Sequence, residues 1–181
     1  MSDRIVVGIE PGETRALAES LNRAFDEVAL AAQQAAHETA GWLAGQVRDD
    51  LATESGVAAS VFLRRVKRYV RTGVDARGRV FVGLYRPEAS EKNLGALTQQ
   101  ADGARAGRHV FPGAFVATMP NGFRGIFRRT GRFGRRGNPR LERIEVEKVD
   151  LPSPAELASR YELRAEVYFR RAFDQRVARL A

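Results

Sequence analysis

The longest stretch of the sequence that can form one helix runs from about Thr14 to Ala52, and it limits the folds open to the chain. The stretch is rich in Ala, Leu, Glu, Gln and Arg and contains no proline. At about 1.5 Å per residue, the helix would reach roughly 55 Å. A domain of 181 residues does not need so long a helix, so we expect it to cross its own sheet and then another body. Apolar and small residues recur on one face, namely Leu17, Leu21, Phe25, Val28, Ala32, Ala35 and Thr39, followed by Leu43, Val47 and Leu51.

The rest of the chain predicts strands and a closing helix. Strands are expected where β-branched and aromatic residues gather between turns that contain glycine or proline. Gly41 and Gly45, on either side of Trp42, mark a kink or a close contact in the long helix. The predicted segments are a strand over 5–9, a short helix over 57–65, an edge strand or helix extension over 66–71, a strand over 79–85 covered on both faces, a loop over 88–107 with one helical turn near 94–97, a hairpin of 110–118 and 123–128 around a turn at 120–122, a Gly/Arg loop over 130–139, and a strand over 141–149 with a bulge near Glu147.

The sequence Ser153-Pro154-Ala155-Glu156 predicts the start of the last helix, which we expect over 153–180. A serine three residues before a glutamate forms a capping box, and proline suits the first helical position. The predicted apolar face comprises Tyr161, Ala165, Tyr168, Phe169, Ala172 and Val177. The order of elements predicts one α+β domain over 1–181, in which the two helices pack on a small, mostly antiparallel sheet over 66–150.

Charge and composition narrow the classes of partner. Basic residues number 30 against 22 acidic ones, which gives a net charge of +8 and favours a polyanion or an acidic protein surface over an ordinary basic surface. Only three of the cations are lysines. The absence of cysteine excludes disulfides, thiolate catalysis and cysteine metal sites. No apolar run is long enough for a membrane span, and the first residues lack a signal-peptide pattern, so we expect a protein made in the cytoplasm without a membrane partner.

Candidate catalytic and metal-binding residues are few. His37 and His109 have no second histidine or carboxylate at zincin spacing, so packing or surface positions are favoured for both. Three acidic residues, Glu142, Glu145 and Glu147, could bind Mg²⁺, but Arg143 and Lys148 lie between and beside them and favour a solvated charged strand. The sequence therefore predicts no enzyme, no cofactor and no metal.

Glycine spacing and the paired aspartates complete the search for chemistry. Gly131, Gly134 and Gly137 precede a strand and lack the G-K-[ST] sequence of a phosphate-binding loop, so a phosphate cradle is not favoured. The pair Asp49-Asp50 is interpreted as a solvated helix end.

The segment from Gly122 to Arg143 contains eight arginines among glycines and phenylalanines. Basic residues with interleaved aromatic residues can hold a nucleic-acid backbone and stack its bases. The alternative, favoured for Phe123 and Phe127, is a hairpin in which the phenylalanines enter the core and the arginines alternate outward. The candidate contact to a subunit, a partner protein or DNA is Arg128, Arg129, Arg132, Phe133, Arg135, Arg136 and Arg140.

The hairpin region resembles the minor tail protein Z family of long-tailed phages. The likeness rests on the strand with Phe111-Pro-Gly-Ala-Phe, the turn at Asn121-Gly122, the returning strand to Arg128 and the basic loop that follows. It continues through Ile144-Glu-Val146 and the proline-bearing helix entry. The N-terminal half contributes Leu21-Asn-Arg-Ala24, Val57 and the basic Leu63-Arg-Arg65. The likeness covers about residues 14–180, and the segment 88–107 has no counterpart in it.

The resemblance implies a structural tail-completion protein of the virion. Such proteins form a ring, expected to be a hexamer, at the head-proximal end of the tail. The ring joins the tail tube or terminator to the neck, and DNA passes through its lumen. The expected partners are therefore other copies of the chain, other tail and neck proteins, and DNA in passage. A neighbouring subunit or an acidic tail protein is favoured over DNA as the partner of the arginine loop, because DNA must slide.

Overall fold

The computed structural model describes residues 11–72, 77–133 and 142–180, with no side-chain description for 11–14 and 133. Two long helices, two short ones and three small antiparallel sheets make up this part of the chain, which confirms the predicted α+β class. The strand predicted over 5–9 lies outside the described residues.

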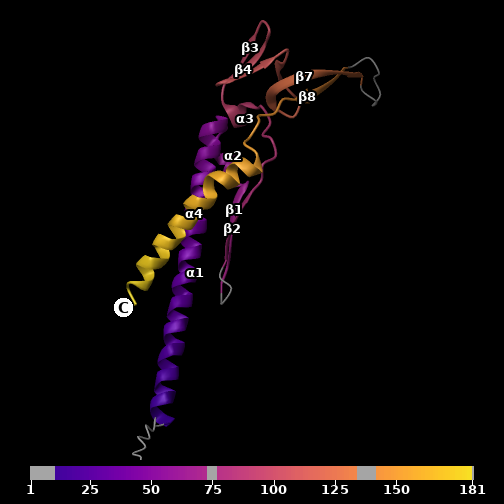
Figure 1. The fold of residues 1–181 in the computed structure, drawn as a ribbon. Helices are drawn as coiled ribbons and strands as arrows, with labels where there is room; N and C mark the ends of the chain where they lie inside the picture. The colour runs from indigo at the N-terminus through magenta and orange to yellow at the C-terminus, as the bar shows by residue number, and fades with distance from the viewer. Residues whose placement is uncertain (1–10, 73–76, 134–141, 181) are drawn as a thin grey trace, which may run out of the picture.

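The predicted long helix is confirmed as α1, which runs without interruption from Pro11 to Ser55. Its 45 residues span about 68 Å at about 1.5 Å per residue. Residues 31–55 pack against the rest of the molecule, whereas every side chain from 15 to 30 is exposed. Figure 1 shows this first part of α1 projecting alone, away from the sheets. Gly41 marks a close contact, since an added Cβ would lie 2.9 Å from Nη1 of Arg68.

A two-stranded ribbon lies along the packed part of α1. The short helix α2 (Ala59–Leu63) leads into β1 (Val66–Arg71), which pairs antiparallel with β2 (Arg77–Val82). Of the two alternatives for 66–71, the strand is therefore confirmed. The prediction that both faces of the second strand are covered is wrong, because Phe81 is exposed and only the other face meets α1.

The segment predicted as a long loop over 88–107 is instead largely structured. It contains α3 (Glu91–Leu94), β3 (Leu97–Gln100) and β4 (Gly103–Ala106), and β4 also pairs with β5 (His109–Pro112). The prediction failed because these strands carry mostly small and polar residues, which have weak strand signals. Gly103 permits the close approach of two strands here, since a Cβ would lie 2.4 Å from the carbonyl oxygen of Phe111.

The predicted hairpin is confirmed as β6 (Phe115–Thr118) and β7 (Arg124–Phe133). The strand predicted over 110–118 is wrong in extent. Gly113 has a φ of 68° and ends β5, so β5 and β6 belong to different sheets. The third strand, β8 (Glu142–Val146), pairs with β7.

The Gly/Arg segment was predicted as a loop from residue 130, but β7 continues to Phe133 and the residues of the segment after 133 are not described. A register shift that was not predicted lies in β7, between Arg129 and Phe133. The bulge predicted near Glu147 falls just beyond the end of β8 at Val146, where the more buried positions change from 144 and 146 to 147 and 149. The single sheet predicted over 66–150 is likewise wrong, because the strands form three sheets.

The closing helix α4 (Pro154–Val177) begins at the predicted capping box. The Ser153 hydroxyl accepts from the Glu156 amide at 3.2 Å, and the Glu156 carboxylate accepts from the Ser153 amide at 2.6 Å. These hydrogen bonds lower the pKa of Glu156, the bond from the backbone of Ser153 having the larger effect. From this start α4 runs back along α1, so its first turns help to cover the core. Fully buried side chains at the centre of the core include Leu51, Phe62, Ile126 and Val149.

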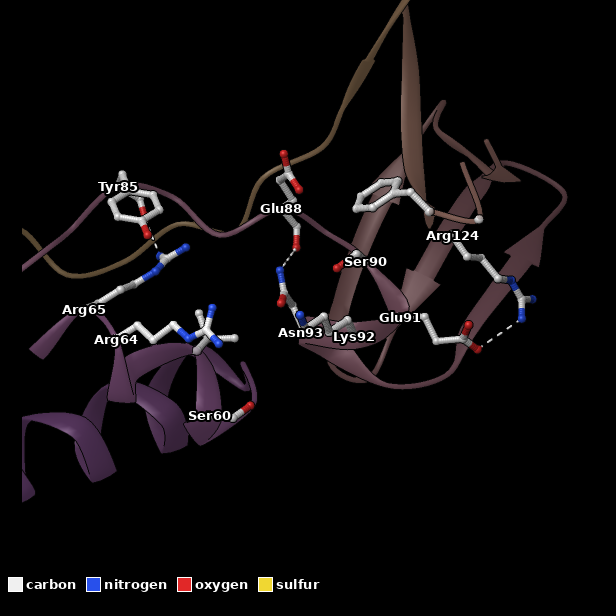
Figure 2. Close-up of a pocket in the computed structure, with 13 residues that line it drawn as sticks. Ser60, Arg64, Arg65, Tyr85, Glu88, Ser90, Glu91, Lys92, Asn93 and Arg124 are labelled. Atoms are coloured by element: carbon white, nitrogen blue, oxygen red, sulfur yellow. Dashed lines mark hydrogen bonds and ion pairs between the residues drawn. The ribbon is translucent and has the colours of Figure 1, made fainter. Parts of the chain in front are cut away.

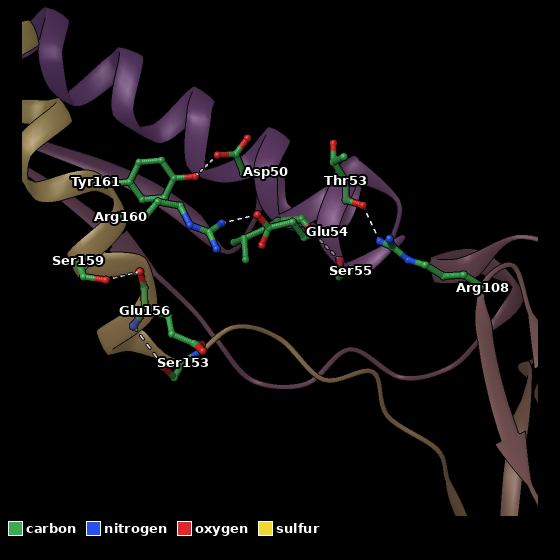
Figure 3. A network of polar contacts seen from close by, with 11 residues as sticks. Asp50, Thr53, Glu54, Ser55, Arg108, Ser153, Glu156, Ser159, Arg160 and Tyr161 are labelled. Atoms are coloured by element: carbon green, nitrogen blue, oxygen red, sulfur yellow. Dashed lines mark hydrogen bonds and ion pairs between the residues drawn. The ribbon is translucent and has the colours of Figure 1, made fainter.

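The end of α1 is a polar joint between α4 and the β4–β5 turn (Figure 3). The hydroxyl of Tyr161 donates to the Asp50 carboxylate, and Arg160 forms an ion pair with Glu54. On the other side, Arg108 donates to the carbonyl oxygen of Thr53 at 2.5 Å. The interpretation of Asp50 as part of a solvated helix end is therefore wrong. The joint fixes the direction in which α1 leaves the body.

We expect the free energy of unfolding to fall at alkaline pH, because the Tyr161 hydroxyl that donates to Asp50 loses its proton there. The pKa of Tyr161 is raised to about 12, first by burial and second by the hydrogen bond to Asp50. Because the folded pKa exceeds the ordinary value of about 10, this contribution to stability is complete below pH 10 and is lost as the pH rises toward 12. Urea denaturation across this range should show the decline in wild type.

The matched variant is Tyr161→Phe, which keeps the buried ring. It should lose about 1 kcal/mol of unfolding free energy at neutral pH, because Asp50 loses its donor. As the pH rises, its free energy of unfolding should also fall less steeply than that of wild type, because no hydroxyl is left to lose a proton. An equal decline in both proteins would contradict the assignment.

Candidate contact surfaces

The arginines of β7 form ion pairs with carboxylates on neighbouring strands and on α3. Arg128 pairs with Glu147, and the guanidinium of Arg129 lies 3.6 Å from the carboxylate of Glu142. At the start of the strand, the Arg124 guanidinium lies 3.1 Å from the Glu91 carboxylate. The hairpin is thus largely neutralised within the described residues. This pairing lowers its capacity to bind phosphate.

The predicted contact residues are only partly brought together. Arg128, Arg129 and Arg132 are exposed along β7. The predicted alternation does not account for this, because Arg128 and Arg129 are consecutive and both exposed, while the preceding residues Ile126 and Phe127 are both buried. For Phe133 only the backbone is described, and Arg135, Arg136 and Arg140 lie outside the described residues. The prediction that Phe127 enters the core is confirmed, and the half-buried ring of Phe123 meets it edge-on with centroids 6.0 Å apart.

A hollow of about 790 Å³ separates α2 from α3 and the start of β7. Figure 2 shows Arg64 and Ser60 on one side and Lys92 and Asn93 on the other. Arg65 covers the ring of Tyr85 at 3.7 Å from its centroid. The other residues that line the hollow are Val61, Glu88, Ser90, Glu91, Gly122, Phe123 and Arg124. Its polar groups are mostly engaged with the chain itself, as in the bond from Asn93 to the carbonyl oxygen of Glu88 at 2.8 Å.

The catalytic and metal candidates take other roles. His109 lies 2.6 Å from the carbonyl oxygen of Ser55, and His37 is exposed on α1. Glu142 also accepts from the Gly131 amide at 2.7 Å, and Glu145 lies 3.9 Å from Arg143. No group of three His, Cys, Asp or Glu side chains suited to a metal occurs in the described part of the chain.

The exposed part of α1, residues 15–30, is called the arm here. Leu21 is 50% exposed and Phe25 is 71% exposed, and Leu17 and Val28 lie on the same face. Farther along α1, this face carries Ala31, Ala35 and Thr39, all of which are buried. Large apolar side chains therefore lie on the part of this face that nothing in the described structure covers, although residues of the same kind, such as Val47 and Leu51, are buried where the helix packs. An exposed apolar stripe of this kind marks an interaction surface.

A second apolar surface lies on α4 beside Trp42, and it is called the α4 hollow here. Leu163 is 68% exposed and Val167 is 59% exposed, although both lie off the predicted apolar face. The rings of Trp42 and Tyr168 stack with centroids 4.5 Å apart and give the hollow a flat floor. Its volume is about 340 Å³, and Arg164 and Arg171 complete the lining. Two large apolar residues on the polar side of α4 were the sequence signal for it.

The floor of the α4 hollow is held in place by polar contacts to α1. Glu38 accepts a hydrogen bond from Arg176 at 2.5 Å and another from Tyr168 at 3.0 Å. These bonds lower the pKa of Glu38, the bond from Arg176 having the larger effect. The orientation of Tyr168 is therefore fixed before any partner binds.

No protein-family model matches the chain, and no curated protein or solved structure matches it either. The likeness to the minor tail protein Z family stays a resemblance carried by the residues quoted above. No helix among the described residues is both long enough and apolar enough to cross a membrane.

The pairing of the β7 arginines can be measured with a double-mutant cycle on Arg128 and Glu147. Both side chains are replaced by glutamine, singly and together, and the unfolding free energy is measured in urea. Because the pair is partly exposed, we expect a coupling energy of about 0.5–1 kcal/mol. A coupling indistinguishable from zero would mean that Arg128 is free to bind a partner.

Proposed function

We propose that this protein is a structural subunit that assembles with copies of itself. More narrowly, we propose a tail-completion protein of a long-tailed phage, located in the virion at the head-proximal end of the tail. In this role a ring of subunits, expected to be a hexamer, joins the tail tube or terminator to the neck. The observation that carries the proposal is the arm, an apolar helical face that the described part of its own chain leaves uncovered.

The α4 hollow supplies a matching surface for the arm. The arm cannot reach the hollow of its own chain, because Leu21 and Trp42 lie on one continuous helix about 30 Å apart. A second copy can offer its hollow to the arm of the first. The contact then joins two different surfaces, and such head-to-tail contacts generate rings when the rotation closes.

The charges on the two surfaces are compatible with this contact. The arm exposes Glu27, its acidic residue nearest the apolar stripe, and the hollow is edged by Arg164 and Arg171. Opposite charges at the rim of an apolar contact guide orientation and association more than they raise affinity. The apolar stripe therefore provides the main stabilisation, and the rim sets which way the arm lies.

The resemblance to the minor tail protein Z family supports the narrower part of the proposal. It rests on the ordered set of hairpin, basic loop and proline-capped helix, with an Ala-rich helix before them. An Arg-rich nucleic-acid-binding protein is the alternative function from the sequence. Pairing of the β7 arginines weakens the part of that alternative that depends on them.

Self-association is tested with the double variant Leu21→Gln and Phe25→Gln. Each buried apolar side chain stabilises a contact by about 1.5–3 kcal/mol, so the pair should weaken association by about a hundredfold or more. Sedimentation velocity over a range of concentrations measures the effect. The matched control is Arg23→Gln with Asp26→Gln, which changes the opposite face of the arm and, like the test variant, leaves net charge unchanged.

The control variant should associate like wild type, and electron microscopy of the wild-type protein should show closed rings. A monomer at all concentrations, or equal weakening by both double variants, would contradict the role of the arm. Phage that lack the protein should accumulate tails that fail to join heads. Normal joining in its absence would contradict the narrower function while leaving the self-association result intact.

A further inference from the structure

The outer face of the β1–β2 ribbon is a cationic surface that the sequence interpretation did not single out. The register pairs Lys67 with Phe81, Tyr69 with Arg79, and Arg71 with Arg77. Alternation along the two strands places all six side chains on the face that points away from α1. All six are exposed, and the two rings remain 56% and 59% accessible at Tyr69 and Phe81, respectively.

Internal ion pairs do not neutralise this face within the described residues. Lys67, Arg71, Arg77 and Arg79 have no hydrogen bond or ion pair there, whereas Arg124, Arg128 and Arg129 of β7 all have carboxylate partners. Among the paired residues of β1 and β2, no acidic side chain lies on the outer face. Four cations in three alternate cross-strand pairs, with no partner among the described residues, therefore attract an external anion.

The geometry points to the phosphate backbone of duplex DNA as the occupant of this face. Phosphates are regularly spaced along both strands, whereas an acidic protein would need an equally dense carboxylate patch of matching shape. At about 3.3 Å per residue, Arg77 and Arg79 lie about 6.6 Å apart along β2, and Lys67 and Arg71 lie about 13 Å apart along β1 with Tyr69 between them. Arginine, lysine and tyrosine are all common donors to phosphate. Binding of this kind depends on charge, not on base sequence.

A duplex fits the shape of the face better than a single strand does. Proteins that bind single strands hold them in a groove with bases stacked on aromatic rings. Two hollows beside the ribbon are lined by Val70 and Thr72 and by Val80 and Val82, at its margin or on its inner side, and not by the outer-face residues. The inference goes beyond the proposed function and does not depend on a ring.

The test measures binding of the full-length protein to a labelled duplex of about 20 base pairs at several salt concentrations. The ribbon variant combines Arg71→Gln, Arg77→Gln and Arg79→Gln. The matched control combines Arg124→Gln, Arg128→Gln and Arg129→Gln, which removes the same charge from paired positions. The ribbon variant should reduce the log–log salt slope by about 2–3, at about 0.9 per lost phosphate contact, while the control reduces it by less than about 1.

Two further variants separate charge contact from misfolding and from assembly. Replacing the same three ribbon arginines by lysine keeps the charge and should keep the wild-type slope. The arm variant Leu21→Gln with Phe25→Gln should keep the slope per subunit, because the ribbon is a separate element. The inference would be overturned by equal slopes for the ribbon variant and wild type, or by equal losses in ribbon and control variants. Tighter binding of poly-glutamate or of a single strand than of the duplex would also overturn it.

Discussion

The continuity of α1 is the constraint on which the rest of the structure depends. One helix of 45 residues cannot bend back on itself, so the described body of the chain leaves uncovered any face of the helix that extends beyond it. The sheets and α4 cover it only from about residue 31 onward. The polar joint of Asp50 and Glu54 with α4 fixes the direction in which the arm projects. Helix geometry and the apolar residues of the arm are together the basis of the proposed assembly role.

Charge has two different roles in this chain. In the β6–β8 sheet, the consecutive residues Arg128 and Arg129 lie on opposite faces, and each pairs with a nearby glutamate, which holds a small hairpin together. On the β1–β2 ribbon, cations alternate outward, but no acidic residue among the paired positions shares the outer face. The density of arginine in the sequence was therefore a poor guide to where free positive charge lies. Whether an arginine keeps a free positive charge depends on its partner across the strands, and the sequence alone does not show that partner.

Strong local signals allowed the helices to be predicted. A long segment of good helix formers and a capping box at Ser153 gave both helices and the start of the second. The hairpin followed from Asn121-Gly122 between two apolar runs. By contrast, β3 and β4 carry residues such as Gln99 and Ala104, whose strand conformation comes from pairing and packing with neighbours. Such tertiary determinants leave little periodicity in the sequence.

The sequence predicted only some of the candidate surfaces, because the others depend on contacts between distant parts of the chain. The stripe of Leu17, Leu21 and Phe25 was visible, but its exposure depends on where α4 and the ribbon stop. The α4 hollow forms because Trp42 of α1 stacks on Tyr168 of α4. These two residues lie 126 positions apart in the sequence, so the hollow could not be predicted from it. The outer face of the ribbon can be recognised only from the register of β1 against β2, since Lys67 and Arg79 become neighbours only through that pairing.

Hydrogen–deuterium exchange of the arm amides, measured as a function of protein concentration, tests the central claim most directly. An uncovered helical segment opens readily, so amides at 15–30 should exchange fast in dilute protein and slow down as subunits associate. Amides at 40–52 should stay slow throughout, because the core already covers that part of α1. Fast exchange of the arm at every concentration would contradict an assembly role for it, as would full protection in a monomer.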